Sequence, residues 1–239
     1  MESLEPFRET SLERVAKDIS RQMIPLNFDG GTNRELKVLC LGSHSDDIEI
    51  GCGGTILRLA EQYPRSTFDW VVLSAVGPRE TEARRSASLF VNSSRLRGPL
   101  VKAFRDGFLP YVGDEVKAVF EELKQSVSPD LIFTHTRKDA HQDHRLVAEL
   151  TWNTFRNHLI LEYEIPKYDG DMGQPNFFLP LESEVVQKKI RFLIDAFRSQ
   201  HGKRWFQEET FQALMRLRGM ECNAPSGYAE AFYCHKLVI

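Results

Sequence analysis

The chain has 239 residues, of which 41% are hydrophobic and 27% charged, and its formal net charge is −3. This composition is ordinary for a soluble globular protein, and the weak negative charge argues against a general binder of nucleic acid or acidic membranes. No apolar run reaches the roughly 20 residues of a membrane span. Residues 1–18 carry charges throughout, unlike a secretory signal, and the four cysteines form no Cys-x-x-Cys pair. We therefore expect a cytoplasmic protein with reduced thiols.

Helical and extended patterns alternate along most of the chain. A polar helix is predicted at residues 2–23, before a connector and a first strand at 37–42. There follow, in order, a helix from 56, a strand at 70–76, a helix at 80–91, a strand at 100–104, a helix at 115–126, a strand at 131–135, a helix from 146, a strand at 159–165, a loop at 168–176, a helix at 185–197, a helix at 211–217 with Gly219 as its C-cap, and a strand at 232–239. This alternation predicts an α/β fold in one domain, residues 1–239, with a mostly parallel sheet covered by helices on both faces.

A polar loop directly follows the first predicted strand. It carries, in order, His44, Asp46, Asp47 and Glu49. A glycine-rich segment at residues 51–54 then leads into a helical pattern. Ligands and substrates of open α/β sheets bind at the carboxyl ends of strands, so this loop lies where chemistry is expected.

A second polar cluster, His141, Asp143 and His144, follows the predicted strand at residues 131–135. Because both clusters come after parallel strands, they can meet at one edge of the sheet. Two histidines and one aspartate, with a fourth position open to water, are typical of a catalytic zinc site. A metal held in this way acidifies its water and polarises a carbonyl. The spacing also fits a plain alternative, in which the aspartates only cap helices and fill a loop.

The same residues allow a division of roles that the spacing alone does not fix. Asp46 and Asp47 are adjacent, so one can bind metal while the other takes a proton from water as a general base. His141 could be cationic and stabilise an oxyanion or protonate a leaving amine. Asp143 could accept a hydrogen bond from His141 and fix the orientation of its ring.

At this point the sequence resembles a known family, the PIG-L/LmbE-like zinc-dependent N-deacetylases. Residues 44–55 resemble the family's His-Pro-Asp-Asp-x-Glu signature, and residues 141–144 match its second motif, His-x-Asp-His. Further likenesses are an Arg/Glu-rich helix start at residues 79–82, an Asp-Gly loop at 106–107 and a Tyr-x-Glu-x-Phe ending at 228–232. The likeness runs from about residue 37 to the C-terminus, which leaves residues 1–36 as a helical extension outside it.

The resemblance implies a Rossmann-like three-layer fold and removal of acetyl groups from N-acetylglucosamine-type amides, with an amino-sugar substrate and acetate as product. It implies zinc as the cofactor, although the same donors can hold ferrous iron. The residues it marks are His44, Asp47 and His144 as metal ligands, Asp46 as general base, His141 as oxyanion or leaving-group partner, and Asp143 as the residue that orients His141. Two positions depart from the family: Ser45 replaces the usual proline, and Asp139 stands where some relatives have a tyrosine that could serve as oxyanion donor.

Several residues have both a functional and a structural interpretation. Arg79 and Asp106 are candidate substrate-binding residues, or else a surface charge and a plain turn. Tyr228 is a candidate substrate-binding residue or oxyanion donor. His135, at a strand end, is a packed histidine or a site residue. Finally, Trp152, Trp205 and Phe177–Phe178 are core residues or contacts of a homo-oligomer, with sugar-stacking platforms as the functional alternative.

Three rival functions stay open at this stage. A nicotinamide dehydrogenase fits poorly, because the Gly-x-Gly-x-x-Gly pattern is not met and Asp46 and Asp47 would crowd a pyrophosphate; it also predicts no bound metal. A metal-dependent hydrolase of another amide or ester is the closest enzymatic alternative. A catalytically silent zinc- or sugar-binding module needs neither the base Asp46 nor the acid His141, and their presence argues against it.

Overall fold

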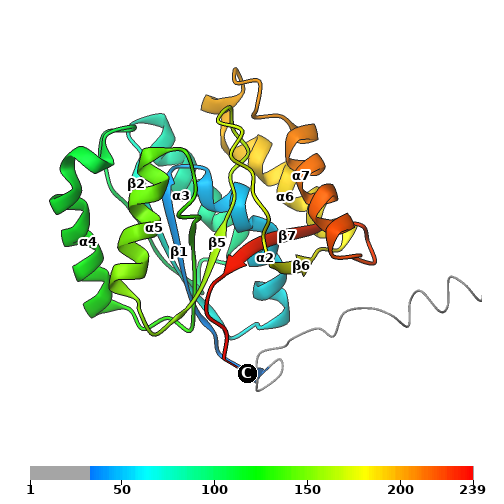
Figure 1. The fold of residues 1–239 in the computed structure, drawn as a ribbon, viewed down its shortest axis with the longest axis horizontal. Coiled ribbons are helices and arrows are strands. Elements are labelled where there is room, and N and C mark those ends of the chain that lie inside the picture. The colour runs from blue at the N-terminus through cyan, green and yellow to red at the C-terminus, as the bar shows by residue number, and fades with distance from the viewer. Residues whose placement is uncertain (1–32, 239) are drawn as a thin grey trace, which may run out of the picture.

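A computed structural model describes residues 33–238 of the chain. The helix predicted at residues 2–23 lies outside the described residues. The centre of the structure is a seven-stranded sheet with the strand order β3-β2-β1-β4-β5-β7-β6 (Figure 1). Its strands are β1 (Lys37–His44), β2 (Thr67–Ser74), β3 (Leu96–Val101), β4 (Leu131–His135), β5 (Leu159–Tyr163), β6 (Phe177–Pro180) and β7 (Ala229–Cys234). Strands β1 to β5 pair in parallel, whereas β7 is antiparallel to both β5 and β6.

Helices cover both faces of this sheet, which confirms the predicted three-layer α/β fold. They are α2 (Asp47–Gln62), α3 (Pro78–Phe90), α4 (Gly113–Ser126), α5 (Gln142–Thr154), α6 (Ser183–Ala196) and α7 (Glu208–Glu221), with short 3₁₀ turns at Leu109–Val112 and Arg198–Gln200. Helices α4 and α5 lie on one face, and α2, α3, α6 and α7 lie on the other (Figure 1). Within residues 33–238, no helix has the length and apolar character that a membrane crossing requires.

The central strand β1 is apolar on both sides, as expected for a parallel strand between two helical layers. Val38 and Cys40 belong to the larger core under α2, α3, α6 and α7, whereas Leu39 and Leu41 belong to the core under α4 and α5. The alternation follows from the two-residue period of a strand. It places the end of β1, at His44, between the two layers.

Both edge strands differ from the sequence-based prediction. Strand β3 begins at Leu96 rather than at residue 100, because Gly98 and Pro99 read as a turn although they lie inside an edge strand. Strand β6 was not predicted, since it has only four residues and ends in Pro180. Proline is tolerated at sheet edges, where a missing backbone N–H breaks no ladder, and there it hides a strand from pattern reading.

Two further boundaries are corrected near the C-terminus. Helix α7 continues to Glu221, so Gly219 is a position inside the helix and not its C-cap. A Cβ at Gly219 would lie 2.2 Å from the carbonyl oxygen of Gly227, which explains the glycine by close packing. Strand β7 begins at Ala229, ahead of the predicted residue 232. The aromatic residues for which the sequence left core packing, oligomer contact and sugar stacking open pack within this chain: Trp205 and Phe177 on the larger core, Trp152 on the smaller one, and Phe178 on a third cluster.

Candidate metal centre and active site

The loop between β1 and α2 places three polar side chains at the carboxyl edge of the sheet. His44 is the last residue of β1, Asp46 is the N-cap position of α2 and Asp47 is its first residue. The Oδ2 atom of Asp47 accepts a hydrogen bond from the backbone N–H of His44 over 2.7 Å. This bond folds the loop back on itself, so the side chains of residues 44 and 47 face the same space.

Helix α5 brings the second cluster to the same edge. His141 caps the helix, because its Nδ1 accepts a hydrogen bond from the backbone N–H of Asp143 over 3.2 Å. His144 lies in the first turn and is 3% exposed. Its ring centroid is 4.6 Å from that of His141 and 5.1 Å from that of His44. The structure therefore brings the two motifs together, as expected for two motifs that each follow a parallel strand.

Three donor atoms form a compact triangle at this meeting point. Nδ1 of His44 lies 3.1 Å from Nε2 of His144 and 3.3 Å from Oδ2 of Asp47, and the third side, from His144 to Asp47, is 3.5 Å. Ligands about 2.0–2.1 Å from a tetrahedral zinc ion lie about 3.3–3.4 Å from one another. His44, Asp47 and His144 therefore fit a zinc-type ion both in donor chemistry and in spacing.

A further carboxylate supports His144 from behind. Nδ1 of His144 lies 2.9 Å from Oδ2 of Asp139, which is buried. Nearby positive charge outweighs burial and holds the pKa of Asp139 well below its ordinary value, so the carboxylate is ionised and the histidine donates. A carboxylate on the far nitrogen is the usual support of a metal-binding histidine, since it fixes the tautomer and leaves Nε2 free for the metal. Sequence reasoning gave Asp139 no role.

His135 is a second residue that sequence reasoning left undecided. At the end of β4, it is fully buried and stacks on His144 with 3.9 Å between ring centroids. Its Nε2 lies 3.2 Å from Oδ2 of Asp47 and 3.1 Å from the backbone N of Ser43, which donates to it. Burial, reinforced by the charge of His144, lowers the pKa of His135 to about 4. His135 is therefore neutral at neutral pH and belongs to the wall of the cluster.

The cluster offers more donors than one ion needs. Within residues 33–238, three other triads have donor atoms close enough to share a metal. They are His44 with His141 and His144, Asp47 with His135 and His144, and His44 with Asp106 and Asp143. His44, Asp47 and His144 form the triad in which each residue contacts both others, with every donor pair at 3.5 Å or less.

Asp46 differs from Asp47 in having almost no partners. It is 3% exposed, and its Oδ2 has no hydrogen-bond partner among the described residues. Its Oδ1 lies 4.0 Å from a guanidinium nitrogen of Arg79. Burial and the neighbouring charge of Asp47 raise the pKa of Asp46, against the opposing effect of Arg79 and His44. A buried carboxylate with a raised pKa and a free oxygen is suited to accept a proton.

Arg79 and Asp106 lie together beside the cluster. The guanidinium group of Arg79, in the first turn of α3, donates to Oδ2 of Asp106 over 2.6 Å and to the hydroxyl of Ser45 over 3.2 Å. Oδ1 of Asp106 is 3.1 Å from Nε2 of His44. His44 and Arg79 lower the pKa of Asp106, which stays ionised although its side chain is 51% exposed. Asp106 is thus the exposed member of this group.

Asp143 has partners other than the predicted one. Its buried carboxylate accepts hydrogen bonds from the backbone N–H groups of Gly107, over 2.7 Å, and Leu109, over 3.1 Å. It also lies 3.2 Å from Nε2 of His44. His141 is instead oriented by the backbone N–H of Asp143. Asp143 therefore ties the loop that carries Asp106 to the ring of His44.

Tyr228 lies in different surroundings from the other candidates. Its hydroxyl accepts a hydrogen bond from Nε2 of Gln212 over 3.0 Å, and Arg216 lies over its ring. Both partners belong to α7. Within residues 33–238, the hydrogen bond of the Tyr228 hydroxyl and the cation–π contact of its ring thus connect it to α7 and not to the histidines.

Known proteins are similar to this chain in sequence and in fold. Residues 39–155 match the family model described as PIG-L, GlcNAc-PI de-N-acetylase. The chain belongs to the PIG-L family. Among curated relatives, the uncharacterized deacetylase YaiS of Escherichia coli K12 is 25% identical over 154 residues, which cover 56% of this chain and 76% of YaiS.

Two solved structures are similar in fold. The N,N'-diacetylchitobiose deacetylase of Pyrococcus horikoshii is 20% identical with a TM-score of 0.63, over 98% of this chain and 94% of that one. GalB, the 4-carboxy-2-hydroxymuconate hydratase of Pseudomonas putida KT2440, is 19% identical with a TM-score of 0.64, over 85% of this chain and 98% of that one. Because a deacetylase and a hydratase share the fold, the fold alone does not select the reaction.

Proposed function

We propose that this PIG-L protein is a metal-dependent hydrolase that removes the N-acetyl group from an N-acetylglucosamine-type amino sugar or its conjugate and releases acetate. The observation that carries the proposal is Asp46, a buried carboxylate with an oxygen free of partners, beside a triad of donors spaced for a metal ion. A module that only binds a metal or a sugar has no use for such a base. The family membership supports amide hydrolysis as the reaction class.

His44, Asp47 and His144 would hold the metal, which we propose to be zinc, with ferrous iron as an ion that the same donors accept. When bound, this ion supplies Lewis-acid chemistry: it polarises the amide carbonyl and makes a water more acidic. Asp139 holds His144 in the tautomer that leaves Nε2 free, and the backbone N–H of His44 holds Asp47. The chain thus presents three ligands in fixed orientations before any substrate binds.

Asp46 and His141 would carry the proton transfers and the oxyanion. Asp46 accepts a proton at Oδ2 as the water oxygen attacks the carbonyl carbon. His141 is neutral, because burial and then the charge of His144 lower its pKa, and its Nδ1 is occupied as an acceptor. The ring proton therefore resides on Nε2, which we assign as a donor to the developing oxyanion, in place of the cationic role that the sequence also allowed.

Collapse of the tetrahedral intermediate completes the reaction. The bond from the carbonyl carbon to nitrogen breaks, and Asp46, now a carboxylic acid, returns its proton to the leaving nitrogen. Water has then added its oxygen and one hydrogen to the acetyl group, which leaves as acetic acid and ionises to acetate, and one proton to the amine. We assign Arg79 and Asp106 to sugar binding, since Asp106 is half exposed beside the cluster and Arg79 sets its orientation.

The test is acetate release by the purified protein from a panel of N-acetylated amino sugars, with and without a chelator and with zinc or ferrous iron restored. We expect release from at least one sugar, lost on chelation and recovered on addition of metal. A hydratase-type activity, which GalB makes the specific alternative, would add water to an unsaturated acid and release no acetate. If the protein binds metal, releases no acetate and hydrates such an acid, the proposed deacetylase function is wrong and a hydratase function takes its place.

A further inference from the structure

Helix α2 is interrupted one turn after the cluster. Cys52, in its interior, has φ −142° and ψ 15°, outside the helical range. In a regular helix the carbonyl of Ile50 would accept from the N–H of Gly54, and that of Gly51 from the N–H of Thr55. The interruption separates a short first segment, which carries Asp47, from the longer segment that ends at Gln62.

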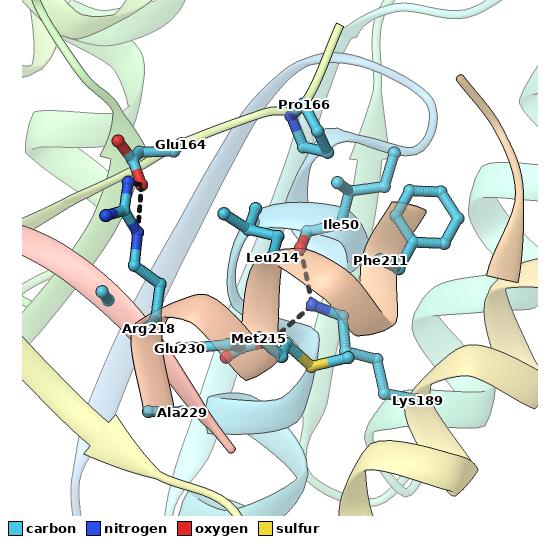
Figure 2. Close-up of a pocket in the computed structure, with 12 residues that line it drawn as sticks. Ile50, Glu164, Pro166, Lys189, Phe211, Leu214, Met215, Arg218, Ala229 and Glu230 are labelled. Atoms are coloured by element: carbon cyan, nitrogen blue, oxygen red, sulfur yellow. Dashed lines mark hydrogen bonds and ion pairs between the residues drawn. The ribbon is translucent and has the colours of Figure 1, made fainter. Parts of the chain in front are cut away.

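A buried ion pair supplies partners at this interruption. Nζ of Lys189, in α6, donates to the carbonyl oxygen of Ile50 over 2.6 Å and lies 2.6 Å from Oε1 of Glu230, in β7 (Figure 2). Oε1 of Glu230 accepts from the N–H of Gly54 over 2.8 Å, and Oε2 accepts from that of Thr55 over 2.6 Å. Lys189 is 2% exposed and Glu230 is 4% exposed. The carboxylate thus caps the second segment, as an anion at a helix N-terminus does.

Glycine at position 54 makes this contact possible. A Cβ there would lie 3.0 Å from Oε1 of Glu230 and 2.5 Å from Cδ1 of Leu181. A side chain would therefore push Glu230 away from the backbone N–H that it accepts. The glycine-rich segment at residues 51–54 is a place for close approach, and not a cradle for phosphate.

The contacts continue from the ion pair to the cluster. The backbone N–H of Ile50 donates to the carbonyl oxygen of Asp46 over 3.1 Å, while the carbonyl of Ile50 accepts from Lys189. The backbone at Ile50 therefore connects Lys189 to the segment that carries the proposed base, Asp46, and the proposed metal ligand, Asp47. The first segment of α2 is too short to be stable by itself, because an isolated helical turn has few internal hydrogen bonds.

We propose that Lys189 and Glu230 are positioning residues, which hold the first turn of α2 so that Asp46 and Asp47 keep the geometry needed for metal binding and proton transfer. This inference rests on the proposed function: its catalytic half needs the deacetylation, whereas its metal-binding half needs only the proposed metal ligands. Removal of the pair should weaken metal binding and lower kcat, with little change in KM, since neither residue contacts the proposed sugar-binding residues Arg79 and Asp106.

The chain offers a matched control in a second buried ion pair. Glu164 and Arg218 lie 2.7 Å apart and are both under 10% exposed. They line the same small cavity as Lys189 and Glu230 (Figure 2). Their polar partners are Gly173, Glu221 and Tyr233, none of which belongs to α2. Loss of this pair should cost stability without moving Asp46 or Asp47.

The experiment compares Lys189→Met, Glu230→Gln and the double variant with Glu164→Gln. Glu230→Gln leaves the charge of Lys189 buried without its partner, so the double variant, which removes both charges at similar volume, guards against simple misfolding. For each folded protein, the zinc dissociation constant is measured by competition with a chromogenic chelator, and kcat, KM and the thermal melting midpoint are recorded.

We expect the zinc dissociation constant to rise about tenfold or more in the Lys189 and Glu230 variants, by analogy with the loss of other groups that orient metal ligands. Glu164→Gln should lower the melting midpoint and leave the dissociation constant unchanged. Equal metal affinity in the wild type and the folded double variant would overturn the proposal. If the wild type binds zinc but deacetylates no sugar, the proposed function fails. The comparison of metal affinities then still decides whether Lys189 and Glu230 position the metal ligand.

Discussion

Asp139 accepts a hydrogen bond from His144, so the two nitrogens of this ring face two carboxylates, Oδ2 of Asp139 at 2.9 Å and Oδ2 of Asp47 at 3.5 Å. Oδ1 of Asp139 also accepts from the backbone N–H of His141 over 2.8 Å and pairs with Lys167. One aspartate therefore orients both histidines of the second motif. It occupies the position that the sequence marked only as a departure from some relatives.

Replacement of Asp139 by asparagine should weaken metal binding. An amide nitrogen facing Nδ1 of His144 cannot accept its proton, so the ring loses its fixed tautomer and part of its basicity. We expect a zinc dissociation constant about 10–100-fold higher, measured by chelator competition. Asp169→Asn, at an exposed position, is the control and should bind like the wild type. Unchanged affinity in Asp139→Asn would show that Asp139 does not support the ligand.

Metal binding should strengthen as the pH rises through neutrality. Burial alone would lower the pKa of His44, but Asp47, Asp106 and Asp143 outweigh it and raise this pKa well above its ordinary value of 6.5. The metal-free ring therefore keeps its second proton above pH 6.5, and a metal must displace that proton from Nδ1. Zinc affinity, titrated at several pH values from about 6 to about 9, should increase and level off only above the raised pKa. A flat profile would rule out His44 as a ligand in competition with protons.

Gly51 should not tolerate a side chain. A Cβ at this position would lie 2.2 Å from the ring of Tyr163, whose hydroxyl donates to the carbonyl of Leu41. Gly51→Ala should lower the free energy of unfolding by about 1–3 kcal/mol, as overpacked cores do. The comparison is Gly113→Ala, where the backbone has φ −60° and, apart from the adjoining backbone, no atom of residues 33–238 lies within 4 Å of the added Cβ.

Gly113→Ala should be neutral or stabilising by about 0.4–1 kcal/mol, because alanine restricts only the unfolded chain there. Chemical denaturation of both variants beside the wild type measures the difference. Equal stability of Gly51→Ala and the wild type would mean that Tyr163 can move at no cost.

The strands and the two motifs could be predicted from sequence because both are local patterns. The apolar run at residues 37–42 gives β1, and polar residues after two parallel strands must meet at one edge of the sheet. Local patterns failed where Pro99 and Pro180 interrupt edge strands. They also failed at Gly219, where a glycine inside α7 reads as a helix end.

The supporting contacts of the site could not be read from sequence, because they join residues far apart along the chain. Nothing near Glu230 indicates that it caps Gly54, 176 positions earlier. Likewise, nothing in the sequence marks Lys189 as buried, because lysine is rarely buried without a partner, yet it is 2% exposed and bonded to Ile50. Asp143 was predicted to orient His141, two positions earlier, whereas its carboxylate contacts His44, 99 positions away.

The most direct test of the account is a comparison of Asp46→Asn with the wild type, once the panel has identified a deacetylated sugar. Metal content and acetate release are measured on the same samples. We expect Asp46→Asn to bind the same amount of metal as the wild type and to lose about 10²–10⁴-fold in kcat, because a general base contributes about that much. Near wild-type acetate release from Asp46→Asn would show that Asp46 is not the general base. Loss of metal from this variant would show that Asp46 is itself a metal ligand.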